Sequence, residues 1–322
     1  MALETSIEPA TQSVTSPPLC ELHVHLEGCV DAAHRRRWRA PIHFPAPFNA
    51  TPRNFDEFLQ HLRYNFNFLH SVDAYVDAAL SYARRSHTQG IVYAELQINL
   101  ALLNSWKLDL VLVLDRINLA LAALDGAPTL RFIVDLPWHI SPRAFEPLSA
   151  RASTLKALGV VGLSLGGDER LAHPKAWVKA FAQARRMGLK TACHAGETTG
   201  AGNAQRIVET LAPDRVTHAV TIGPWINRLG PYAPPVDVCL TSNRALGVID
   251  DFSHHPLALW LGSGVPFTLS TDDPAVVQTD LATEYRIAAT HFAGFAAYAE
   301  HLPRHWLAAA FDGVGARRAL GQ

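Results

Sequence analysis

Cysteine is scarce in this sequence, and its scarcity excludes a scaffold built on disulfides. Only four cysteines occur among 322 residues, and no two of them form a Cys-x-x-Cys pair. A chain of this length can bury a large enough apolar core to fold without crosslinks. We therefore expect four reduced thiols and, with them, a cytoplasmic location.

An excess of one charge sign and long apolar runs are also missing. The 28 basic and 29 acidic side chains nearly cancel, so no strong field draws the protein to nucleic acid or to an anionic membrane. No apolar run is both long and charge-free enough to span a bilayer, and residues 1–18 lack the pattern of a signal peptide. We expect a disordered tail over residues 1–18 and a small-molecule ligand, with no nucleic-acid or membrane partner.

Short apolar or β-branched runs recur along the rest of the chain, and most are followed by helical periodicity. The runs are Leu19–His25, Ile91–Ile98, Leu130–Leu136, Val160–Leu165, Leu189–His194, Arg215–His218, Val236–Thr241 and Val265–Thr271. This alternation is typical of βα units around a parallel sheet. It predicts an α/β protein with a single (β/α)8 TIM-type barrel domain over residues 19–322, in which chemistry takes place at the C-terminal ends of the strands.

A long insertion separates the first two predicted strands. Aromatic and leucine side chains recur there at three- and four-residue steps from Phe55 to Leu69, and a second helical pattern follows through Leu80. Such a stripe packs in the core of most proteins, but it also fits a helical lid over a pocket. We assign residues 54–87 to a helical insertion and leave both roles open.

Polar side chains stand at the ends of several predicted strands. His23 and His25 are two positions apart on a strand, so their side chains face the same way. His194 and His218 end the fifth and sixth strands, and Asp272 follows the eighth. Three histidines and one carboxylate suit a divalent transition ion such as zinc, with a position left open for water.

Five motifs in this order resemble those of the adenosine deaminase family of purine aminohydrolases. They are ELHVHLEG from Glu21, GLSLGGDE from Gly162, CHAGET from Cys193, TSN from Thr241 and LSTDDP from Leu269. The resemblance runs from about Glu21 to Tyr285. It implies a zinc-dependent hydrolase that replaces the 6-amino group of a purine by oxygen and releases ammonia.

The family pattern also implies a role for each matching residue. One Zn²⁺ per chain would be bound by His23, His25, His194 and Asp272. Attack on C6 requires a proton on ring N1, and Glu197 matches the proton donor of that step. His218 matches the histidine beside the water that the metal binds.

Substrate contacts follow from the same pattern. Asp273 would meet purine N7, and the backbone N–H of Gly167 would meet N3, where glycine lets the main chain approach the ring. Glu27 and, besides its metal role, His25 would also lie at the substrate. Adenosine-specific members usually carry aspartate at the position of Glu27, whereas adenine deaminases and aminodeoxyfutalosine deaminases carry glutamate.

The sequence departs from the family pattern at four further positions, which are Ser164, Thr217, Ala219 and Leu240. None of them is a predicted ligand, so the chemistry is retained, but the substrate stays open. Adenosine or a 5′-modified relative such as aminodeoxyfutalosine is our first prediction, and free adenine is the alternative. The sequence does not define the oligomeric state.

Two other functions fit a barrel of this kind. One is a metal-dependent hydrolase of a different amide or ester, because a fold alone does not fix a function. The other is a purine-binding relative without catalytic activity. The presence of Glu197 three residues after His194, together with all four predicted ligands, favours the deaminase.

Several outlying residues have two possible roles each. Arg143 and the cluster Arg35–Arg39 could receive a substrate carboxylate or could be solvated surface charges. His254 and His255 precede a proline and are expected to cap or support rather than to bind a metal. Trp138 and His139 could line a pocket or could only pack.

Overall fold

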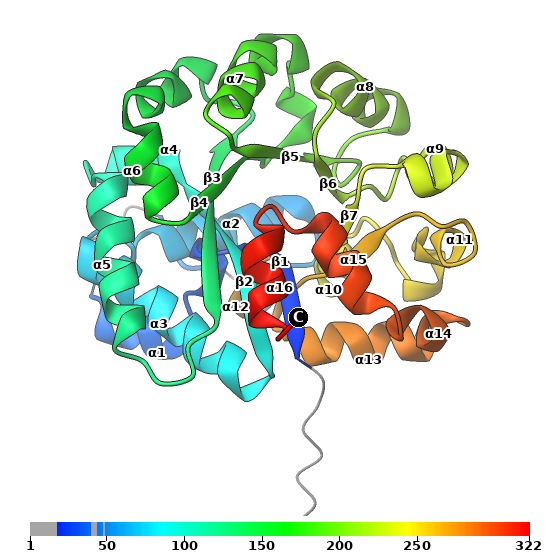
Figure 1. The fold of residues 1–322 in the computed structure, drawn as a ribbon, viewed down its shortest axis with the longest axis horizontal. Coiled ribbons are helices and arrows are strands. Elements are labelled where there is room, and N and C mark those ends of the chain that lie inside the picture. The colour runs from blue at the N-terminus through cyan, green and yellow to red at the C-terminus, as the bar shows by residue number, and fades with distance from the viewer. Residues whose placement is uncertain (1–17, 40–43, 48) are drawn as a thin grey trace, which may run out of the picture.

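The computed structural model describes residues 18–39, 44–47 and 49–322, and it places the strands in one eight-stranded parallel sheet in sequence order. The strands are β1 Leu19–His25, β2 Ile91–Asn99, β3 Thr129–Pro137, β4 Val160–Gly166, β5 Lys190–Ala195, β6 Arg215–His218, β7 Val236–Val238 and β8 Phe267–Leu269. Figure 1 shows the strands inside a ring of helices. The predicted (β/α)8 barrel is confirmed. The tail predicted over residues 1–18 lies outside the described residues, apart from Pro18.

Helices follow the strands and cover the outside of the barrel (Figure 1). They are α1 Ala32–Arg37, α2 Phe55–Phe66, α3 Val72–Thr88, α4 Leu100–Ser105, α5 Leu110–Ala122, α6 Ala152–Ala157, α7 Pro174–Arg186, α8 Ala201–Leu211, α9 Gly223–Leu229, α10 Leu240–Ala245, α11 Leu257–Trp260, α12 Pro274–Val277, α13 Leu281–His291, α14 Phe295–Ala299, α15 Leu302–Ala309 and α16 Gly313–Ala319. None of these described helices combines the length and the apolar character needed to cross a membrane. All four cysteines are buried and free, as expected.

The last two strands are shorter than predicted. The run from Val236 ends as a strand at Val238, because Cys239 starts the turn into α10 and Leu240 is already helical. The eighth strand begins at Phe267, since Pro266 has no N–H to donate to a ladder. Both predicted runs mix apolar with polar residues, and composition alone does not show where a ladder ends.

The barrel closes at one point between its first and last strands. Val24 and Asp272 form a single parallel bridge. The backbone N–H of His25 donates to the Asp272 carbonyl at 2.8 Å, and the Asp272 N–H donates to the His23 carbonyl at 3.2 Å. Closure therefore brings a predicted carboxylate ligand against two predicted histidine ligands.

The insertion after β1 contains three helices, of which α2 and α3 match the predicted periodicity. Asn54 caps α2 by accepting the Glu57 N–H at 2.9 Å, and Ser71 caps α3 by accepting the Ala74 N–H at 3.2 Å. The apolar face of α3 is buried in the main core, whereas Phe58 of α2 belongs to a smaller separate cluster. The two helices thus have different roles.

A buried ion network fills the barrel at the end opposite the predicted site. Arg215, the first residue of β6, pairs with Glu95 at 2.7 Å and with Asp237 at 2.6 Å. Its guanidinium also donates to the carbonyls of Leu22 and Ala309 and lies 4.1 Å from the centre of the Phe311 ring. One arginine therefore links four strands to the C-terminal segment.

Replacement of Arg215 by methionine is expected to destabilise the fold strongly. The change leaves two buried carboxylates without their cation, which costs about 3–5 kcal/mol in comparable sites. Urea unfolding followed by circular dichroism measures the loss. Arg151→Met is the control, because its ion pair with Asp109 is exposed and contributes less than about 1 kcal/mol. Similar losses for the two variants would contradict this view of the network.

Candidate active site

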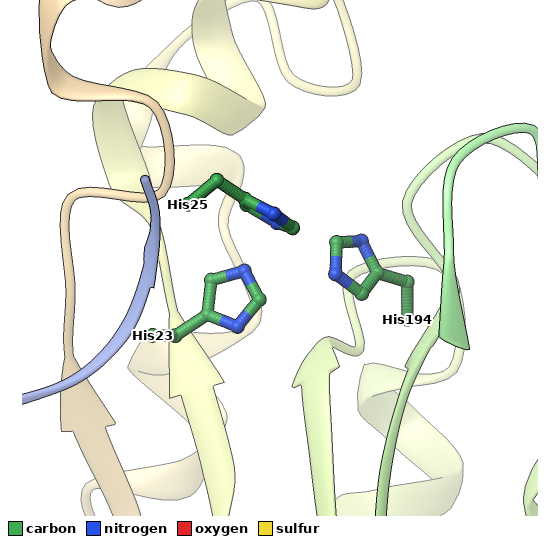
Figure 2. Close-up of side chains that lie close together, drawn as sticks. All are labelled: His23, His25 and His194. Carbon is green, nitrogen blue, oxygen red and sulfur yellow. The ribbon is translucent and has the colours of Figure 1, made fainter. Parts of the chain in front are cut away.

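Three histidines converge at the C-terminal ends of the strands. Figure 2 shows His23 and His25 on β1 and His194 on β5 with their rings turned toward a common space. Their ring centroids are separated by 5.0 Å for His23 and His25, 4.9 Å for His23 and His194, and 5.4 Å for His25 and His194. His23 and His25, two positions apart on β1, therefore face the same side of the strand, as the alternation of side chains along a strand predicts.

Asp272 completes this cluster. Its Oδ1 lies 3.1 Å from Nε2 of His23 and 3.4 Å from Nε2 of His25. Its Oδ2 accepts a hydrogen bond from the Ser242 hydroxyl at 2.6 Å. Ser242 thus fixes the carboxylate so that the other oxygen faces the histidines.

The cluster has the properties of a metal site. The ring nitrogens of His23, His25 and His194 lie within 4.8 Å of one another, and Nε2 of His194 is buried with no partner among the described residues. Burial lowers the pKa of His23 and of His25 to about 3, which keeps both imidazoles in the neutral form that binds metals. Three nitrogens and one carboxylate oxygen suit zinc with an open position.

Glu197 and His218 lie beside the cluster. The Glu197 carboxylate is 3.4 Å from Nε2 of His218 and 3.8 Å from Nδ1 of His194. Burial alone lowers the pKa of His194, but hydrogen bonding to Glu197 raises it to about 9, so a cation binding there must displace a proton. The site therefore holds a carboxylate that can exchange a proton with its neighbours.

The backbone around Glu197 and the ring of His218 are held by further polar groups. Glu169 accepts the N–H groups of Gly196 and Glu197 at 2.9 and 3.0 Å. The Asn243 amide lies 3.0 Å from Nδ1 of His218. These contacts orient the two groups without occupying the side of Glu197 that faces the pocket.

Backbone strain is concentrated at the same place. His218, Ala219 and Asp272 have φ values of 67°, 54° and 64°, in the left-handed region that side chains disfavour. Strain of this kind persists where surrounding contacts fix the backbone, and it gathers at functional sites.

A pocket opens directly over the cluster. Its polar side is lined by strand-end residues, and its other side by the apolar face of α2. The lining includes His25, Glu27, Asn99, Asp135, His139, Gly167, His194, Glu197, Asp272, Asp273, Phe55, Phe58, Leu59, Leu62, Arg63 and Phe66. Part of the aromatic and leucine stripe of the insertion therefore lines the pocket.

One glycine lines this pocket and another packs against one of its lining residues. Gly167 has φ +75°, which side chains rarely adopt, and it lines the pocket, where its main chain is open to a ligand. A Cβ on Gly28 would lie 2.1 Å from Oδ1 of Asp273 and 2.5 Å from its Cα, so only glycine fits beside that carboxyl.

Comparison with known proteins identifies the family. The family model described as adenosine deaminase matches residues 18–311. The chain belongs to the adenosine deaminase family. Membership makes it a hydrolase of the deaminase type.

Individual relatives add detail. The chain is 30% identical over 297 residues to the aminodeoxyfutalosine deaminase of Acidothermus cellulolyticus, covering 86% of this chain and 83% of that one. It is 34% identical over 165 residues to the adenine deaminase of Chelativorans sp., which spans about half of each protein, 50% and 51%. An amidohydrolase from Burkholderia ambifaria with bound Zn shares the fold, with a TM-score of 0.79, 22% identity and coverage of 95% and 90%.

The outlying candidates fall in different places. Arg143 and Arg35–Arg39 do not belong to the pocket lining, which instead includes Arg63 from α2. His255 contacts Asn243 at 3.3 Å and accepts the Leu257 N–H at 3.0 Å, so it supports the site, whereas His254 pairs with Asp250 at the surface. Trp138 is buried, and His139 lines the pocket.

Several functional neighbours were not singled out by sequence. Ser242 and Asn243 belong to the TSN motif, and Glu169 belongs to GGDE. The motifs therefore pointed to these residues, but the sequence did not show which groups they contact. Gln97 on β2 had no such signal. Its amide contacts Nδ1 of His23, and the Thr217 hydroxyl lies 3.3 Å from the same nitrogen.

Gln97 can set the tautomer of His23. When Nε2 of an imidazole binds a metal, Nδ1 carries the proton and needs an acceptor. Oε1 of Gln97 has no partner among the described residues, and rotation of the amide brings that oxygen to Nδ1. Gln97 and Thr217 therefore hold the ring of His23 from the side opposite Asp272.

Gln97→Leu is expected to weaken zinc binding roughly 10–100-fold, as loss of such a partner does at other metal sites. Competition with a chromophoric chelator measures the affinity directly. Gln97→Glu keeps an acceptor for Nδ1 of His23 and should retain most of the zinc affinity. Gln183→Leu, on the outer helix α7, serves as the control. An unchanged affinity in Gln97→Leu would show that the ring is held by packing alone.

Proposed function

We propose that this protein is a zinc-dependent hydrolase that removes the 6-amino group of an adenine nucleoside and gives the 6-oxopurine and ammonia. The observation that carries the proposal is the convergence of His23, His25, His194 and Asp272 beside Glu197 and His218. A structural zinc site would close its fourth position with protein ligands, whereas this cluster opens into a pocket. Family membership supports the same chemistry.

His23, His25, His194 and Asp272 would hold one zinc ion per chain. A zinc ion in such a site supplies a water of lowered pKa, which is a nucleophile for C6 at neutral pH. The assignment is supported by Nε2 of His194, which has no partner among the described residues, and by Oδ1 of Asp272, which faces His23 and His25 while Ser242 holds Oδ2.

Glu197 would donate a proton to ring N1, so that the ring can accept the electrons of the attacking oxygen. Its carboxylate lines the pocket, and Glu169 holds its backbone. His218, 3.4 Å from Glu197, would orient the water and accept its proton. Asn243 keeps the His218 ring in place for this role.

Asp273 and Gly167 would recognise the purine edge. Burial and the nearby charge of Asp272 raise the pKa of Asp273 well above its usual range, which favours the protonated carboxyl that would donate to N7. The main chain of Gly167 borders the pocket, where its N–H would face N3. His25 and Glu27 border the same pocket and would lie near the sugar.

The likeness to aminodeoxyfutalosine deaminase extends over 86% of the chain and favours a nucleoside with a modified 5′ position. Free adenine is the second candidate, since 34% identity to adenine deaminase covers half of the chain. Ammonia release from zinc-loaded protein with adenosine, aminodeoxyfutalosine and adenine, compared as kcat/KM, distinguishes them. Absence of turnover on all three with zinc bound would overturn the proposal.

Glu197→Gln is expected to bind zinc normally and to lose roughly 10²–10⁴-fold in kcat, because the amide cannot donate the proton. His23→Ala and Asp272→Ala should instead lose the metal. Metal analysis of dialysed protein, together with the ammonia assay, separates the two effects. Full activity in Glu197→Gln would remove Glu197 from the mechanism.

A further inference from the structure

Three carboxyl groups of the pocket have a buried oxygen without a partner. These atoms are Oε2 of Glu27, Oδ1 of Asp135 and Oδ1 of Asp273. A buried acceptor without a donor is costly, and native proteins rarely leave one unless a ligand or water completes it. Glu27 and Asp273 have roles in the proposed function, but Asp135 has none.

Asp135 is placed to face a ligand. It stands near the end of β3, opposite Ser164 of β4 in the strand register, and its exposed fraction is only 4%. Pro137 and His139, two and four residues further, border the same pocket. The side chain therefore lies on the pocket side of the barrel rim rather than among the outer helices.

Asp135 and Glu27 form one acidic wall. Oε1 of Glu27 already accepts the Asn99 N–H at 3.0 Å, whereas Oε2 of Glu27 and Oδ1 of Asp135 have no partner in the described part of the chain. Asp168, also in the lining, differs because its carboxylate is held by Arg170 through two contacts of 2.8 Å. The wall thus offers acceptors for hydroxyl groups and repels a neighbouring anion.

We propose that Asp135 is a specificity-determining residue that binds the sugar of an uncharged nucleoside and, with Glu27, excludes a 5′-phosphate. The inference rests on the proposed function, in which Glu197, Gly167 and Asp273 already serve ring atoms N1, N3 and N7. The N–H and O–H donors that remain on a nucleoside are the 6-amino group, which leaves as ammonia in the proposed reaction, and the sugar hydroxyls. An acidic wall is complementary to them and opposes a nucleotide.

The test compares adenosine, adenine and AMP with wild type, Asp135→Ala and Asp135→Asn. Asp135→Ala should lower kcat/KM for adenosine roughly 10–100-fold, mainly through KM, because a sugar contact is lost. Adenine should change less than about 3-fold, because it has no hydroxyl to lose. Asp135→Asn removes only the charge, so the preference for adenosine over AMP should fall at least about 10-fold.

Zinc content and thermal unfolding are measured on every variant, and Asp125→Asn, at an exposed position in the turn after α5, should leave the adenosine-to-adenine ratio unchanged. Four results would each overturn the inference. In Asp135→Ala these are an equal loss of kcat/KM on adenosine and adenine, loss of zinc, or an unchanged adenosine-to-adenine ratio of kcat/KM. In the wild type it is a preference for free adenine. If the wild type turns over no purine, the proposed function fails. Calorimetric binding of inosine and hypoxanthine then tests Asp135 independently: weaker inosine binding alone in Asp135→Ala supports the inference, and any other pattern overturns it.

Discussion

The backbone pairing of Asp272 with the end of β1 is the constraint on which both the barrel and its site depend. Two hydrogen bonds, to the carbonyl of His23 and from the N–H of His25, join the last strand to the first. The same pairing forces Asp272 into a left-handed conformation and holds its carboxylate against both histidines. Because closure and ligand geometry share these bonds, the fold cannot close without assembling the site.

Buried polar groups divide into those that the protein completes and those that it leaves open. Arg215 pairs with Glu95 and Asp237 at the far end of the barrel, and Glu169 accepts two backbone N–H groups. Oε2 of Glu27, Oδ1 of Asp135 and Nε2 of His194 have no partner in the described chain. Since unpaired buried atoms are destabilising, those that line the pocket are the ones that a ligand can complete.

Sequence reasoning succeeded where a local rule decides the outcome. The alternation of side chains along a strand predicted that His23 and His25 share a face, and the recurring strand and helix patterns predicted the barrel. Gln97 could not be found in this way, because it contacts His23 across strands that are distant in sequence, and Asp135 could not, because no local pattern shows which strand-end side chain borders the pocket. Gln97 lies 74 residues from His23, and nothing in the run Ile91–Ile98 indicates which histidine a glutamine will meet.

The helix α2 shows how one sequence pattern serves two purposes. A stripe of Phe55, Phe58, Leu59 and Phe66 has the periodicity of a core helix, and periodicity does not reveal what the stripe covers. Here it covers the pocket, opposite the acidic strand ends. A ligand between the two surfaces can place a flat apolar face against α2 only while its polar edge points to the metal cluster. The apolar wall therefore contributes orientation as well as the exclusion of water.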